Sequence, residues 1–129
     1  MLDLASGWEL AVERGPDWLF VRISSAGDDG SETPPLAHQL WSLLEEHLTH
    51  RLVLELDQVV VLGSRLIDQL ELLDKWISQR GGVMRLCGLS ARNRRVLKRR
   101  HLDERFPVYG NRLDAVMCRP AGRTPQRPR

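Results

Sequence analysis

The sequence predicts an α/β fold with a mixed, mostly parallel sheet of four or five strands, an N-terminal β-hairpin and about four helices. Two strand-like segments flank a Gly-Pro-Asp turn near the N-terminus, which favours an antiparallel hairpin. Strand-like and helix-like segments then alternate along the chain, and this order is typical of parallel sheets. A length of 129 residues suits one ordinary domain, which we expect over residues 1–118.

The hairpin strands are expected at residues 8–13 and 18–23. Apolar and polar side chains alternate over 8–13, which is the period of a half-buried strand. The later strands are expected at 51–56, 83–87 and 106–109. The first of these is apolar almost throughout, as in strands that are covered on both faces of a sheet.

Helices are expected where leucine recurs every three or four residues or where an N-cap residue follows a strand. They cover residues 35–47, a stretch from about 64 to 80, residues 91–101, and a last helix up to about 118. Gly81-Gly82 ends the second helix, and Ser90 and Asn111 occupy N-cap positions of the two that follow.

The formal net charge of +2 hides an uneven distribution. Residues 1–79 hold 5 basic and 14 acidic side chains, whereas residues 80–129 hold 14 basic and 3 acidic ones. Such asymmetry raises the question of an anionic partner. The segment 119–129 consists mainly of Arg, Pro, Gly and Thr, and this composition predicts a disordered basic tail.

A basic patch is predicted on the third helix, where Arg92, Arg95 and Arg99 share one face. Three explanations of this patch are consistent with the sequence: a solvated surface, an acidic protein partner, or nucleic acid. Nucleic acid is the weaker candidate partner, because phosphate contacts alone would have to hold it. No aromatic side chains interleave with these arginines to stack bases.

Several function classes are disfavoured. The sequence contains no P-loop, dinucleotide glycine fingerprint or nucleophile elbow, so we expect no catalytic residues and no cofactor. The histidines do not form a cluster with metal-ligand spacing, so no metal site is expected.

The sequence contains no run of about 18 apolar residues, so no membrane span is expected. The start of the chain does not resemble a signal peptide. With two cysteines, the expected location is the cytoplasm.

Five short segments, together with the order of the elements, resemble a known family. They are Val60-Val61-Leu62-Gly63-Ser64-Arg65-Leu66, Arg80-Gly81-Gly82, Cys87-Gly88-Leu89-Ser90, Arg95-Val96-Leu97 and His101-Leu102-Asp103-Glu104-Arg105-Phe106-Pro107-Val108-Tyr109. Over roughly residues 8–116 the chain resembles a STAS domain, the fold of bacterial anti-sigma factor antagonists. The resemblance implies a non-enzymatic regulator whose partner is an anti-sigma factor that is also a serine kinase.

The resemblance also implies a phosphoacceptor at Ser64. The family's switch motif reads Asp-Ser-Ser/Thr-Gly-Leu, and its partner kinase modifies the serine after the aspartate. In this chain Gly63 replaces the aspartate, Arg65 the second hydroxyl residue and Leu66 the glycine. Because only the serine of the motif's polar part remains, Ser64 can instead be a simple helix cap.

In this fold the partner-docking face surrounds the same serine. The residues implied are Val60, Leu62, Gly63, Ser64, Arg65 and Asp68. Leu62 is the expected apolar anchor if it is exposed; the alternative is that Val60 and Leu62 belong to the core. The leading hypothesis is therefore an antagonist that binds a kinase-type anti-sigma factor and is switched at Ser64. One alternative is a constitutive interaction module without the switch, and a weaker one is a nucleic-acid or nucleotide binder.

Overall fold

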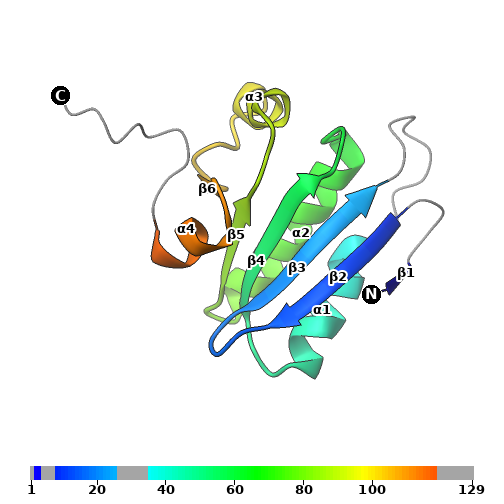
Figure 1. Ribbon diagram of the computed structural model, residues 1–129, viewed down its shortest axis with the longest axis vertical. Coiled ribbons are helices and arrows are strands. Elements are labelled where there is room, and N and C mark those ends of the chain that lie inside the picture. Colours follow the sequence, from blue (N-terminus) through cyan, green and yellow to red (C-terminus); the bar gives the residue numbers. More distant parts are fainter. Residues whose placement is uncertain (1, 4–7, 26–34, 119–129) are drawn as a thin grey trace.

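The computed structural model describes residues 2–3, 8–25 and 35–118, and Figure 1 shows the arrangement of their helices and strands. The tail expected to be disordered, residues 119–129, lies outside the described residues. The strands are β1 (Leu2–Asp3), β2 (Trp8–Arg14), β3 (Leu19–Ser25), β4 (Arg51–Gln58), β5 (Val83–Cys87) and β6 (Val108–Tyr109). The helices are α1 (Leu36–Glu46), α2 (Ser64–Gln79), α3 (Ala91–Arg99) and α4 (Arg112–Met117).

The described strands form one mixed sheet in the order β1-β2-β3-β4-β5-β6. β1, β2 and β3 are paired antiparallel, whereas β3 to β6 are paired parallel. The predicted hairpin and mostly parallel sheet are thus confirmed, with element boundaries within two residues of those expected. The two-residue strand β1 was not expected, because so short a segment shows no alternation.

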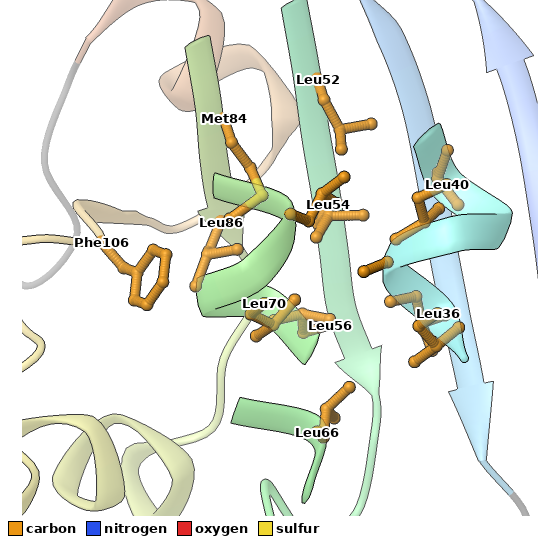
Figure 2. Close-up of a cluster of buried hydrophobic side chains, with 14 of the residues drawn as sticks. Leu36, Leu40, Leu52, Leu54, Leu56, Leu66, Leu70, Met84, Leu86 and Phe106 are labelled. Carbon is orange, nitrogen blue, oxygen red and sulfur yellow. The ribbon is translucent and has the colours of Figure 1, made fainter. Parts of the chain in front are cut away.

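One face of the sheet carries most of the core. The leucines of β4, at 52, 54 and 56, point toward α1 and α2, which lie behind the strands in Figure 1. Figure 2 shows these side chains packed against Leu36 and Leu40 of α1 and Leu70 of α2. Met84, Leu86 and Phe106 extend the cluster toward α3. The apolar character of residues 52–56 is therefore explained by burial, as predicted.

The opposite face has a smaller core and a network of charges. Trp18, Val53, Cys87 and Tyr109 pack there with Ala115 of α4. Burial raises the pKa of the Cys87 thiol to about 12, helped by the nearby Glu55 and Asp57 carboxylates, so this cysteine remains a protonated core residue.

Glu55 is the buried charge of this second face, with 4 % of its surface exposed. Nε and Nη2 of Arg112 donate to its two carboxylate oxygens at 2.5 and 3.2 Å. Arg22 lies 3.3 Å from the same carboxylate, and Arg112 also pairs with Glu13 at 2.9 Å. The hydrogen bond with Glu55 is the main cause of a raised pKa for Arg112. These pairs compensate the cost of burying Glu55 and tie α4 to β2, β3 and β4.

The three helices that follow β4 begin in different ways. Ser90 and Asn111 accept hydrogen bonds from Asn93 N and Asp114 N, respectively, as their predicted N-cap roles require. α2 instead has Gly63 as its N-cap, and no side chain caps it. Ser64 is the first residue of the helix, so its interpretation as a cap is wrong. Gly63, with extended backbone angles, occupies the flanking position.

Replacing Gly63 with Asp is expected to stabilise the fold by about 0.5 kcal/mol. An Asp side chain at an N-cap accepts from a first-turn N–H and places negative charge at the positive end of the helix dipole. The space is open, since a Cβ at Gly63 meets nothing within 4 Å. Urea unfolding measures the change, and Gly63→Ala is the matched control, because alanine enters the same space without an acceptor. A midpoint for the Asp variant no higher than that of the native chain would contradict the prediction.

Candidate functional site

The connection from β4 to α2, residues 59–63, separates its apolar side chains into two environments. Leu62 is 2 % exposed and belongs to the main core. The expectation that Leu62 is an apolar anchor for a partner is therefore wrong. Val60 is 52 % exposed, so it is the apolar side chain that this connection presents to solvent.

A buried amide on α3 holds this connection in place. Asn93 is completely buried, and its Oδ1 accepts a hydrogen bond from Leu62 N at 3.0 Å. Its Nδ2 donates to the carbonyl oxygens of Val59 and Val60 at 3.1 and 3.4 Å. These bonds satisfy backbone groups that would otherwise be buried without partners.

Asn93 did not emerge as a site residue from the sequence. A signal for it exists, however: it is four residues before the buried Leu97 and so lies on the core face of an otherwise strongly basic helix. A polar residue at such a position needs hydrogen-bond partners inside the protein.

The first turns of α2 carry the remaining residues of the implied docking face. Ser64, Arg65 and Asp68 are all exposed. Asp68 lies 3.7 Å from Arg100 of the segment after α3, and this open ion pair contributes little to stability. Arg65 forms no ion pair with any described residue, so its charge is available to a partner.

The chemistry open to Ser64 follows from its position. Its hydroxyl is exposed at the N-terminus of a 16-residue helix, where the helix dipole is positive. Phosphorylation there would add about −1.5 to −2 charges at an end of the helix that favours negative charge. The folded domain can thus carry a phosphate at Ser64, and the added charge would act mainly on whatever binds this surface.

The basic patch lies on the same helix as Asn93. Arg92, Arg95 and Arg99 are exposed, while Asn93 and Leu97 are the buried residues of α3. In the part of the chain that the structure describes, none of the three arginines is paired with a carboxylate.

The described ranges hold neither a metal-binding cluster nor a membrane-spanning helix. Among residues 2–3, 8–25 and 35–118, no three side chains of the His, Cys, Asp and Glu types come together as a possible metal site. No helix within those ranges has the length and apolar character needed to span a membrane.

Comparison with solved structures shows that the fold has close counterparts. An anti-sigma factor antagonist from Mycobacterium paratuberculosis is 22 % identical, with a TM-score of 0.72 over 91 % of this chain and 97 % of that one. RsbS from Moorella thermoacetica, in a substituted form, is 15 % identical, with a TM-score of 0.68 over 84 % of this chain and 92 % of its own.

A third solved structure has the same fold, and a family model matches the sequence. An anti-sigma-factor antagonist (STAS) domain protein from Planctomyces limnophilus is 20 % identical, with a TM-score of 0.62 over 84 % of this chain and 96 % of its own. No curated protein sequence matches the chain. The model of the STAS domain family matches residues 9–115, which include every strand from β3 to β6, the helices α1 to α3 and the first part of α4. The chain therefore belongs to the STAS domain family.

Proposed function

We propose that this STAS domain is a non-enzymatic antagonist that binds an anti-sigma factor through a docking surface formed by Val60, Gly63, Ser64, Arg65 and Asp68. Family membership supports the proposal, as does the likeness to a protein described as an anti-sigma factor antagonist. The observation that carries it is the exposed hydroxyl of Ser64 at the start of α2. The cytoplasm is part of the proposal, because transcription factors are regulated there.

The docking surface combines the features that a specific interface requires. Val60 supplies exposed apolar area, and Arg65 and Asp68 supply charges of both signs that select a complementary partner. Gly63 has no side chain, so a partner can approach the backbone at the start of α2. Because Asn93 already fixes the connection before α2, little conformational entropy is lost when a partner binds.

Phosphorylation of Ser64 is proposed as the switch. The phosphate would place a dianion in the middle of the docking surface, where an acidic partner surface is repelled and an apolar one loses contact. Arg65, the next residue, supplies a positive charge that offsets part of this effect. The unphosphorylated domain is therefore the form proposed to bind the anti-sigma factor.

The switch predicts that the cognate kinase labels Ser64 and that Ser64→Ala abolishes the label. Mass spectrometry after incubation with ATP identifies the modified residue. Ser64→Asp, which mimics part of the phosphate charge, should weaken binding of the anti-sigma factor about ten-fold in a titration. Ser78, exposed near the end of α2, provides the control variant Ser78→Asp, which should bind normally. Labelling at another residue would remove the switch from the proposal.

Asn93→Ala should disturb the docking surface without altering any of its side chains. The variant leaves Leu62 N and the carbonyl oxygen of Val59 without their partner, which costs about 1–3 kcal/mol of stability. Hydrogen exchange at the Leu62 amide should become faster, and affinity for the anti-sigma factor should fall. Arg92→Ala, next to it on the exposed side of α3, is the control. Unchanged exchange at Leu62 would show that Asn93 does not hold the connection.

A constitutive interaction module is the second candidate, and two observations favour it. Gly63 stands where the switch motif has its aspartate, and Arg65 presents an unpaired charge where the motif has a second hydroxyl. A domain of this kind would bind its partner continuously, with Arg65 as a permanent contact.

Two variants separate the constitutive module from the switch. If the module is constitutive, Ser64→Asp changes partner affinity less than two-fold, whereas Arg65→Glu lowers it about ten-fold. The two affinities are measured by isothermal titration with the same anti-sigma factor. A large loss on Ser64→Asp alone excludes the constitutive module and favours the switch.

A further inference from the structure

A groove lies between α3 and β6, on a part of the domain that the docking surface does not include. Its volume is about 650 Å³. Arg94, Arg95 and Lys98 of α3 line it together with Asp103, and Val108 provides apolar area. Figure 1 shows the segment between α3 and β6 returning from the helix to the edge of the sheet.

The groove has an excess of positive charge. Its lining holds three cationic side chains and one carboxylate. None of the three cations is paired with an acidic side chain of a described residue. Arg94 and Lys98 are four residues apart and so lie on the same side of α3. A ligand with several negative charges therefore complements this lining.

Backbone groups of the sheet are also available beside the groove. β6 is the last strand of the sheet. Leu86 N donates to Pro107 O at 3.5 Å, and Gly88 N donates to Tyr109 O at 3.0 Å. Because the pairing of a parallel strand alternates along the chain, the N–H and C=O of Val108 point away from β5. Such an edge can pair with an added strand.

We propose that this groove binds an extended acidic segment of a partner protein, which pairs with Val108 at the edge of β6 and places its carboxylates against Arg94, Arg95 and Lys98. The site goes beyond the proposed function, since it lies outside the docking surface. Nucleic acid suits the groove less well. Tyr109, the aromatic residue of the lining, is only 7 % exposed and offers no face for base stacking.

The test uses the full chain and a fluorescein-labelled peptide of alternating Glu and Val residues, with fluorescence polarisation as the readout. We expect saturable binding that weakens as the salt concentration rises. The double variant Arg94→Glu/Lys98→Glu should bind about ten-fold more weakly. No saturable binding by the wild-type chain at low salt would overturn the proposal.

The matched control is Arg92→Glu/Arg99→Glu, which makes the same change of charge on the same helix outside the groove lining. This variant should lose less than three-fold in affinity. Thermal melting of both double variants checks that they fold. If the two variants lose affinity equally, the peptide responds to overall charge, and the groove is not its site.

Strand pairing is tested on the peptide, so that the protein is unchanged. A peptide with all of its backbone nitrogens methylated keeps its charge but has no N–H to donate along either edge, and it should bind at least five-fold more weakly. Equal affinity would overturn pairing with β6. A single-stranded oligonucleotide of the same net charge should bind more weakly than the unmethylated peptide; tighter binding would assign the groove to nucleic acid instead. Ser64→Asp should leave peptide affinity unchanged, so failure of the docking proposal is distinguishable from failure of this one.

Discussion

The side-chain amide of Asn93 joins the two parts of the domain on which the functional arguments depend. It forms hydrogen bonds with two carbonyl oxygens and one backbone N–H of the connection between β4 and α2. The start of α2 is therefore positioned by α3. Without this amide, buried backbone groups would lack partners, and the connection would have to open to water. The docking surface and the basic groove are thus carried by elements that are hydrogen-bonded to each other.

The sheet is covered unequally, and this shapes the C-terminal part of the fold. Of the helices in the described ranges, three pack on the face that holds the main core, whereas α4 alone, of 6 residues, packs on the other. A helix this short has little apolar area to bury, and charge pairs supplement its packing. Arg112 joins it to Glu55 and Glu13, and its guanidinium lies over the ring of Phe20, 4.4 Å from the centroid.

Most of the fold could be predicted from local patterns, because leucine spacing and alternation report directly on which faces are buried. The caps at Ser90 and Asn111 were also predictable, since each residue bonds within its own helix. Leu62 was not. It follows the strand in an apolar run, and the side chain that fixes its backbone N–H, Asn93, comes 31 residues later in the sequence. The role of Ser64 likewise depended on the exact start of α2. If the helix began one residue later, Ser64 would be its cap, but it begins at Ser64, which places this residue in the first turn.

Gly63 has a genetic consequence. Two of the four glycine codons, GGU and GGC, become aspartate codons by a single base change, and a Cβ at this position meets no atom of the domain within 4 Å. No compensating substitution in the core is needed to gain or lose an aspartate at the start of α2. Mutation can therefore add or remove the aspartate of the switch motif in one step, while the sheet and its packing stay as they are.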